Sequence, residues 1–312
     1  MNGIAAAPWP SVSVVIATRE RPDLLRRAIR SVLSQAYLGR IECVVVFDQS
    51  SAFDLADVAP RDGGDRTLRV IANRRTPGLA GARNSGADRA FGDVLAFCDD
   101  DDEWLPGKLA FQIAALEASG ADVAVTGIEI TTADRRIERV PARDRITREV
   151  LLRSRATEVH PSTVVVRREA FHSSIGPVDE AIPGSYGEDY EWLLRAVTVG
   201  DLAAVCEPLV RVYRTGDSFF TARWQTIADA IVYLTAKHPE LLVDRRNAAR
   251  LYGRLAFAQA ALGRAAVARG WAWRSIRRRP LERRPYLALA VSTRLVRPET
   301  IEAWANRSGR GV

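Results

Sequence analysis

Short apolar runs alternate with amphipathic segments over roughly the first two hundred residues of the chain. Short apolar runs predict buried strands at 11–17 and 41–47, a weaker strand at 68–72 and a further strand at 94–98. Between them, residues 22–34 place apolar side chains on one helical stripe and begin with a proline, which suits a first helical position. This alternation predicts an α/β fold: a mostly parallel sheet flanked by helices.

The rest of the chain is less regular at first and then becomes helical. A small-residue helix is expected at 79–87, and an amphipathic helix from Pro106 to about Ser119. Further strands are predicted at 121–129, 163–167 and 202–212, with one short helix in the charged stretch 131–155 and another helix from about Tyr190. Beyond Thr221 the pattern predicts helices at 227–237, 246–262, 264–277 and 285–295.

Charge is distributed unevenly along the chain. From Thr221 onward there are 18 Arg and Lys residues against six acidic residues, whereas the whole chain carries a net charge of +7. We therefore expect two domains: residues 1–220, and a basic helical C-terminal extension over 221–312. The three cysteines are far apart, with neither zinc spacing nor a disulfide framework, which favours a reducing cytoplasm. No secretory signal is recognisable, and no apolar run approaches the ~18 residues of a membrane span.

One stretch stands out, because a strand-like run stops at four consecutive aspartates, Asp99 to Asp102, followed by Glu103. Like charges repel, so this arrangement needs a reason. Acids can cap the helix that follows, and they can also bind a hard divalent cation with its phosphates. Capping needs one or two acids, so the excess favours the cation, while Asp102 and Glu103 are expected to cap the helix from Pro106.

Polar residues follow the predicted strands at their carboxyl ends, where ligands are expected to bind. Thr18, Asp48, Asn73 and Asp99 each stand at or just after a strand end. In open α/β sheets, ligands bind beyond the carboxyl ends of the strands. These side chains are therefore predicted to converge on one crevice.

Five motifs in the same order give the chain a recognisable resemblance over about residues 11–220. They are Val14–Pro22, Val45–Ser50, Gly81–Gly86, the run from Asp99, and Gly187-Glu188-Asp189. In these motifs the chain resembles the family 2 glycosyltransferases, which have the GT-A fold, use nucleotide sugars and invert the anomeric centre, usually with Mg²⁺ or Mn²⁺.

The resemblance implies a donor site. Asp48 matches the acid that binds the nucleotide base, and Thr18 matches a neighbouring base or ribose contact. Arg83 matches an arginine near the base and the α-phosphate. In the Asp-x-Asp motif, Asp101 matches the direct metal ligand, while Asp99 or Asp100 meets the ribose or the metal through water. Taken alone, Asp48 equally suits an Asx-type turn and Arg83 a surface arginine.

The resemblance also implies a catalytic pair. Asp189 matches the general base that takes the acceptor hydroxyl's proton, and Glu188 would position the acceptor or Asp189. Without the other motifs, Asp189 would be read as a helix cap. The resemblance places the segment that contains His160 under the acceptor site, where this residue would hydrogen-bond acceptor or diphosphate, although a lone histidine is more often structural.

These observations predict a metal-dependent inverting glycosyltransferase of hexosyltransferase type. It would move one sugar from a UDP or dTDP donor to a glycan, lipid-linked or natural-product acceptor. Two rivals are a nucleotidyltransferase and a non-catalytic sugar- or membrane-binding module. The basic tail has three open readings: a solvated cap, self-association, or contact with the inner face of the membrane through the Trp- and Arg-rich segment 271–279. No nucleic-acid partner is expected, because no binding motif accompanies the charge.

Overall fold

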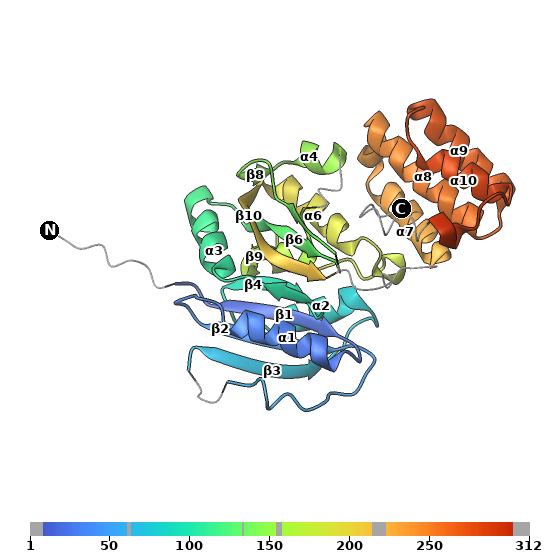
Figure 1. The fold of residues 1–312 in the computed structure, drawn as a ribbon. Coiled ribbons are helices and arrows are strands. Elements are labelled where there is room, and N and C mark those ends of the chain that lie inside the picture. Colours follow the sequence, from blue (N-terminus) through green and yellow to red (C-terminus); the bar gives the residue numbers. More distant parts are fainter. Residues whose placement is uncertain (1–8, 61–63, 133, 154–157, 214–222, 302–312) are drawn as a thin grey trace. The chain divides into compact units, whose positions relative to one another are not determined.

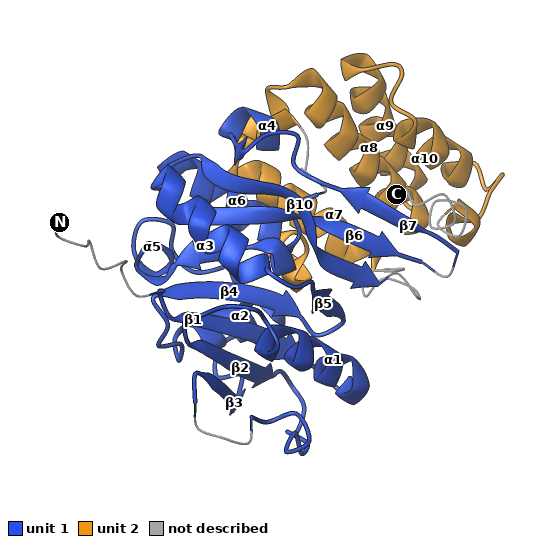
Figure 2. Ribbon diagram, turned by 60° about the vertical axis from the view of Figure 1, so that its left-hand side comes forward, with its two compact units in different colours: residues 1–151, 156–180, 188–215 blue, residues 152–155, 181–187, 216–312 orange. Residues whose placement is uncertain are grey.

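The computed structural model describes residues 9–60, 64–132, 134–153, 158–213 and 223–301. The chain divides into two compact units, drawn in different colours in Figure 2. Unit 1 contains residues 1–151, 156–180 and 188–215. Unit 2 contains the C-terminal part from residue 216 together with 152–155 and 181–187.

A mixed sheet forms the centre of unit 1 (Figure 1). Its first half is parallel and has the order β3-β2-β1-β4. These strands are β1 (Val12–Thr18), β2 (Ile41–Phe47), β3 (Arg66–Ala72) and β4 (Val94–Asp99). They confirm the strands predicted from the apolar runs, and their carboxyl ends meet at one edge of the sheet.

The second half of the sheet mixes directions. Strand β9 (Val165–Arg167) runs antiparallel to both β4 and β6 (Val123–Thr131), and β10 (Leu202–Tyr213) lies parallel to β6. Three short strands complete it: β5 (Asp102–Trp104), β7 (Arg136–Arg139) and β8 (Arg145–Ile146). The stretch 131–155, expected to be loop-like with one helix, thus contributes β7 and β8 as well as α4 (Arg148–Arg153).

Helices cover both faces of the parallel half. Helices α1 (Pro22–Leu33) and α3 (Lys108–Ser119) bury their apolar stripes in one core with alternate residues of β1, β2 and β4. Helix α2 (Leu79–Ala87) lies on the other face, where a Cβ at Gly86 would come within 2.3 Å of Val15. A Cβ at Gly81 would come within 1.9 Å of the Thr76 carbonyl oxygen. The two glycines therefore allow the close approach of this helix to the chain around it.

One prediction for this region is wrong. Asp102 and Glu103 do not cap the following helix, since α3 begins at Lys108 behind Gly107, with no side-chain cap. Both acids belong to β5, which pairs antiparallel with β10. The pairing buries Trp104, and Glu103 accepts a hydrogen bond from the Tyr213 hydroxyl at 2.5 Å. Long-range strand pairing overrode the local capping signal.

Unit 1 also contains α5 (Arg168–His172) and α6 (Glu188–Val199). Unit 2 is helical, with α7 (Trp224–Lys237), α8 (Arg245–Ala261), α9 (Ala265–Arg278) and α10 (Arg284–Ser292). Its core is rich in alanine around Phe257, which lets α8, α9 and α10 pack closely. None of the described helices is both long and apolar enough to cross a bilayer. The predicted boundary at residues 220 and 221 lies outside the described residues, and the two-domain division stays a prediction.

Candidate active site

The carboxyl ends of β1 and β4 bring the predicted donor residues together. The two strands pair so that Ala17 lies opposite Asp99. The Thr18 hydroxyl then donates a hydrogen bond to Asp100 Oδ2 at 2.7 Å. Residues about eighty positions apart in the sequence therefore share one site, as the topology of the strands predicted.

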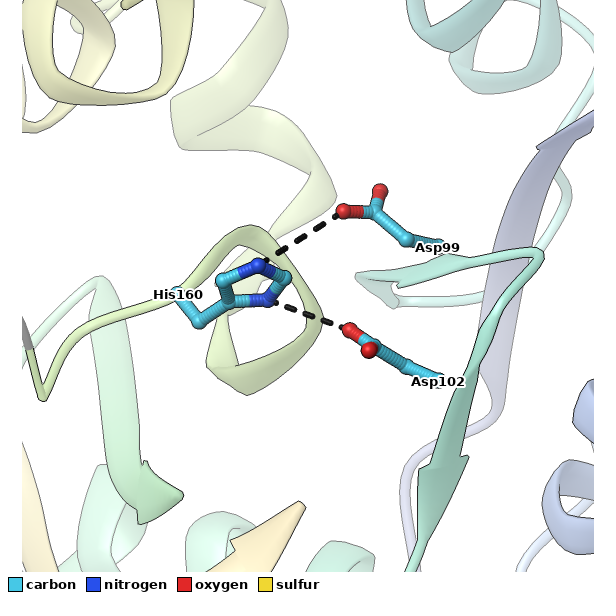
Figure 3. Close-up of side chains that lie close together, drawn as sticks. All are labelled: Asp99, Asp102 and His160. Carbon is cyan, nitrogen blue, oxygen red and sulfur yellow. Dashed lines mark ion pairs between the residues drawn. The ribbon is translucent and has the colours of Figure 1, made fainter. Parts of the chain in front are cut away.

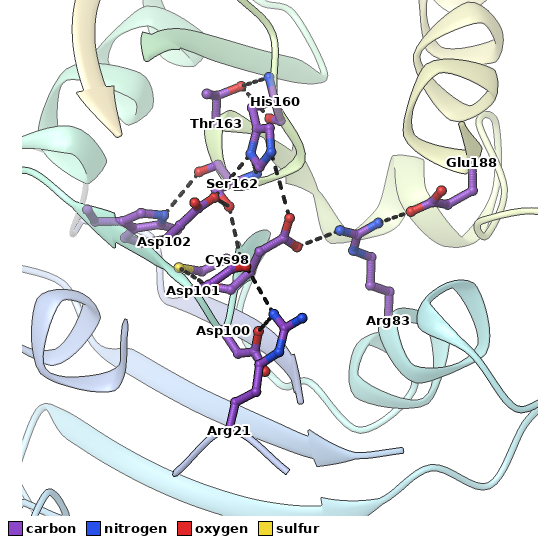
Figure 4. A network of polar contacts seen from close by, with 12 residues as sticks. Arg21, Arg83, Cys98, Asp100, Asp101, Asp102, His160, Ser162, Thr163 and Glu188 are labelled. Carbon is purple, nitrogen blue, oxygen red and sulfur yellow. Dashed lines mark hydrogen bonds and ion pairs between the residues drawn. The ribbon is translucent and has the colours of Figure 1, made fainter. Parts of the chain in front are cut away.

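The four consecutive aspartates have four different environments (Figure 4). Asp99 pairs with Arg83 at 2.6 Å, and Asp101 pairs with Arg21 at 3.0 Å. Arg21 also contacts Asp100, at 3.2 Å. Asp102 is almost fully buried and accepts a hydrogen bond from Ser162 Oγ at 2.5 Å. Each of the four carboxylates thus has a partner, although Asp100 and Asp101 share Arg21.

Asp101 is the most open of the four, with 43% of its side chain exposed. Burial, reinforced by the neighbouring charges of Asp99, Asp102 and Asp100, raises the pKa of Asp101 to about 6, against the opposing effect of Arg21. A carboxylate destabilised in this way gains from a nearby cation. One or two carboxylates satisfy Mg²⁺, which keeps waters or phosphate oxygens as its other ligands. The residues present fit a divalent cation.

Arg83 joins two parts of the sequence that carry the predicted chemistry. It projects from α2, is only 4% exposed, and forms ion pairs with Asp99 and with Glu188. Burial alone would lower the pKa of Arg83, but the charges of Asp99 and Glu188 outweigh burial and raise it. The reading of Arg83 as a surface residue is therefore wrong. Its guanidinium links the end of β4 to the beginning of α6.

The predicted catalytic pair stands in the first turn of α6, where Glu188 is the first helical residue. Burial raises the pKa of Glu188 to about 7, although Arg83 opposes the shift. The charge of Asp189 contributes to raising the pKa values of both Arg83 and His160, so Asp189 belongs to the same electrostatic cluster. The pair and the aspartate run thus converge from opposite sides of Arg83.

His160 lies between two carboxylates (Figure 3). Its Nδ1 is 3.1 Å from Asp102 Oδ2 and its Nε2 is 3.9 Å from Asp99 Oδ2. Burial lowers the pKa of His160, but the charges of Asp102 and Asp99 outweigh burial and raise it to about 9. One ligand atom from each of these three residues lies within 4.8 Å of the others, so they form a second possible set of metal ligands.

Asp48, predicted to bind the nucleotide base, holds the loop that follows β3. Its carboxylate accepts hydrogen bonds from Asn73 Nδ2 at 2.8 Å and from the Gly78 amide at 3.0 Å. Gln49, next to it, has a left-handed backbone with φ of 52°. The role of Asp48 toward a base stays a prediction.

Sequence reasoning assigned no role to several residues that hold the site. Arg21 belongs to the motif Val14–Pro22, and its position before Pro22 at the start of α1 could have indicated it. Ser162 donates to Asp102 and also accepts from the Asp99 amide at 2.9 Å. Glu180 accepts from Asn84 Nδ2 at 2.7 Å and from the Thr76 amide at 3.1 Å. Neither Ser162 nor Glu180 belongs to a motif that could have indicated it.

Comparison with known proteins agrees with this geometry. Residues 13–174 match the model of the family described as glycosyl transferase family 2. The chain is 32% identical over 217 residues to the succinoglycan biosynthesis protein ExoO of Rhizobium meliloti, covering 66% of this chain and 61% of that protein. It is 25% identical over 229 residues to the Escherichia coli UDP-Glc:alpha-D-GlcNAc-diphosphoundecaprenol beta-1,3-glucosyltransferase WfgD, covering 70% of this chain and 86% of that protein.

A solved structure supports the fold. The structure of S. aureus TarS 1-349 in complex with UDP-GlcNAc matches with a TM-score of 0.62 at 18% identity, covering 96% of this chain and 92% of that chain. This likeness bears on the fold alone, and it agrees with the GT-A architecture expected from the sequence motifs.

Proposed function

This chain belongs to glycosyl transferase family 2, and we propose that it transfers one sugar from a nucleoside diphosphate donor to an acceptor hydroxyl with inversion. The observation that carries the proposal is the double ion pair of Arg83 with Asp99 and Glu188. It joins the aspartate run, which is suited to bind a nucleotide-sugar donor with its cation, to Glu188 and Asp189, which are suited to proton transfer. Neither half alone would support a transferase.

Asp189 is proposed as the general base. In a single in-line displacement, the acceptor hydroxyl gives its proton to the Asp189 carboxylate while its oxygen bonds to the anomeric carbon. The bond from that carbon to the diphosphate oxygen breaks, and the electron pair leaves with the diphosphate. Glu188, held by Arg83, would orient the acceptor or Asp189. A charge fixed in this way requires little reorganisation during the reaction.

Asp101 and Asp99 are proposed to hold Mg²⁺ or Mn²⁺, which when bound would neutralise charge on the departing diphosphate. The alternative set of Asp99, Asp102 and His160 is less suitable. Asp102 is only 1% exposed and already accepts from Ser162, whereas Asp101 is open enough to meet a cation that carries phosphates. Thr18, Asp48, Arg83 and Asp100 are proposed to contact the base, ribose and α-phosphate.

A UDP-type donor and a lipid-linked acceptor are the substrates we propose. The supporting fact is the name of the E. coli relative, which specifies UDP-Glc and a diphosphoundecaprenol-linked acceptor for that protein. Because this chain spans less than two thirds of ExoO, the substrates of the whole protein rest on this proposal rather than on the likeness.

The test measures UDP release from UDP-glucose with a polyprenyl-diphosphate-linked GlcNAc acceptor, with and without Mn²⁺. Asp189→Asn should keep its affinity for UDP-glucose in calorimetry but lose about 10²–10⁴-fold in kcat, the usual contribution of general base catalysis. Asp101→Ala should lose both turnover and the dependence of donor binding on Mn²⁺. The exposed Asp201→Asn is the matched control and should behave as the wild type.

Three outcomes would overturn these proposals. If Asp189→Asn lost donor affinity, Asp189 would be a donor-site residue. If Asp101→Ala kept full activity and Asp102→Asn lost metal binding, the cation would belong to the set containing His160. A protein that binds the donor but releases no UDP with any acceptor would be a binding module.

A further inference from the structure

Helix α9 of unit 2 has two chemically different faces. Its buried face consists of the small residues Ala268, Ala272 and Ser275. Ser275 Oγ donates to the Ala249 carbonyl oxygen of α8 at 2.6 Å, and α9 packs against α8 and α10 (Figure 1). The opposite face is exposed and contains Trp273, which is 61% exposed, and Val267. One face of this helix therefore packs in the core of unit 2, and the opposite face is exposed to solvent.

The exposed face is strongly basic. It contains the exposed arginines Arg269, Arg274, Arg277 and Arg278, and α9 has no acidic residue. Between Arg264 and Arg297 the chain has ten arginines and one acid, Glu282, which is buried and pairs with Arg284 at 2.8 Å. Among the described residues, no carboxylate forms an ion pair with an arginine of α9. The arginines of this face are thus available to bind an external anionic partner.

We propose that the exposed face of α9 docks on an anionic lipid surface. Arginines concentrated on one face of a helix are attracted to lipid phosphates, and tryptophan is favoured where the headgroups meet the acyl chains. A purely solvated basic face, or one that binds nucleic acid through phosphates, gives no reason for an exposed Trp273 and Val267 in the middle of the charge. The guanidinium carbon of Arg274 lies 4.5 Å from the ring centroid of Trp271, so a second tryptophan of this helix also has an arginine beside it.

Vesicle co-sedimentation of the full chain tests this proposal. The wild type should sediment with vesicles of equal phosphatidylglycerol and phosphatidylcholine and bind vesicles of pure phosphatidylcholine poorly. Its binding to the anionic vesicles should weaken as the salt concentration is raised. Arg277→Gln with Arg278→Gln should weaken binding about 25-fold, since each arginine near such a surface contributes about fivefold. Trp273→Ser should weaken binding about tenfold through loss of apolar contact with the interface.

Matched variants in the same unit control for charge and apolar area. Arg245→Gln with Arg246→Gln removes two exposed arginines from the start of α8, and Val243→Ser removes an exposed apolar residue. Both should bind vesicles as the wild type does, and circular dichroism should show all variants folded. Equal binding to pure phosphatidylcholine, or equal losses in the control variants, would overturn the proposal. Tight binding to single-stranded RNA that Arg277→Gln with Arg278→Gln weakens and Trp273→Ser leaves unchanged, without vesicle binding, would assign the face to nucleic acid instead.

Docking of α9 on a lipid surface does not depend on the proposed transfer reaction. Asp189→Asn should sediment with anionic vesicles like the wild type, because Asp189 lies in the other unit. Loss of vesicle binding in that variant would show that the two properties cannot be separated, and the docking face would then not be α9. Failure of the vesicle experiment would leave the assay of UDP release untouched.

Discussion

The aspartate run and helix α9 differ in whether their charged side chains are paired within the protein. In the run, each carboxylate meets a partner within unit 1: Arg83 for Asp99, Arg21 for Asp100 and Asp101, and Ser162 with His160 for Asp102. On α9, arginines lie exposed, and none pairs with a carboxylate among the described residues.

The difference follows from the cost of removing charges from water. A buried ion must be paired and hydrogen-bonded, or it destabilises the fold by several kcal/mol (order of magnitude). An exposed arginine stays hydrated and needs no partner. Pairing fixes the side chains of the aspartate run before substrate arrives, whereas the charges of α9 stay available. Substitutions in the first region should therefore change folding stability, and those in the second should change binding.

Arg83→Met should have the largest effect on stability. The change removes a 4%-exposed cation and leaves Asp99 and Glu188 without their shared partner. Breaking a buried pair by removing one partner costs ~3–5 kcal/mol, so the free energy of unfolding in urea should fall by about that amount. UDP release should fall as well, because Glu188 loses the group that holds it.

The matched control is Arg75→Met, which also removes an arginine that bridges two acids. Arg75 pairs with Asp88 at 2.7 Å and Glu180 at 2.9 Å, but 38% of its side chain is exposed. Exposed pairs contribute only ~0–1 kcal/mol. If both variants lost the same stability, burial would not be what separates the two kinds of charge, and the comparison would fail.

Much of the fold was predictable from the sequence because its signals are local. Each strand of the parallel half overlaps a short apolar run, and the helix Leu79–Ala87 has the predicted bounds. Strand β5 was missed because three residues carry no periodicity, and their conformation depends on pairing with β10. Local propensity favoured a helix cap there, and tertiary pairing prevailed.

The site was predictable only in part, for a related reason. Thr18, Arg83, Asp99 and Glu188 were named in advance, and the structure brings them together in one network. The environment of Asp102 was predicted wrongly, since its partners His160 and Ser162 are about sixty residues away in sequence. Which of four adjacent acids is enclosed depends on these distant contacts, and no spacing of residues encodes it.

Lys108 is an exception to the rule that buried charges are paired. It is a fully buried cation, and its Nζ has no hydrogen-bond partner among the described residues. Its Nζ lies 3.8 Å from the ring of Trp104. Burial lowers the pKa of Lys108 from 10.5 to about 7. The unfolded chain binds the proton up to about pH 10.5 and the folded chain only to about 7, so this residue makes stability rise with pH in that window.

Lys108→Met should therefore stabilise the protein at pH 7, by ~2–3 kcal/mol, and the gain should shrink as the pH approaches 10.5. Urea denaturation at pH 7 and pH 10 measures both effects. The other lysine of the chain, Lys237, is exposed, and Lys237→Met should change stability by less than ~0.5 kcal/mol. A loss of stability in Lys108→Met at pH 7 would show that the contact with Trp104 outweighs burial.

His160 tests an internal pairing that is less enclosed than that of Arg83, since 30% of its side chain is exposed. Its pKa of about 9 in the folded protein exceeds the ordinary 6.5, so its stabilising contribution is complete below pH 6.5 and disappears as the pH rises through 9. In the metal-free protein, His160→Gln should cost ~1.5 kcal/mol at pH 6, the lower end for hydrogen bonds to charged groups, and little at pH 9.5. The exposed His172→Gln is the matched control and should change stability by less than ~0.5 kcal/mol. A cost of His160→Gln that is equal at both pH values would mean that packing, and not charge, holds this ring between Asp99 and Asp102.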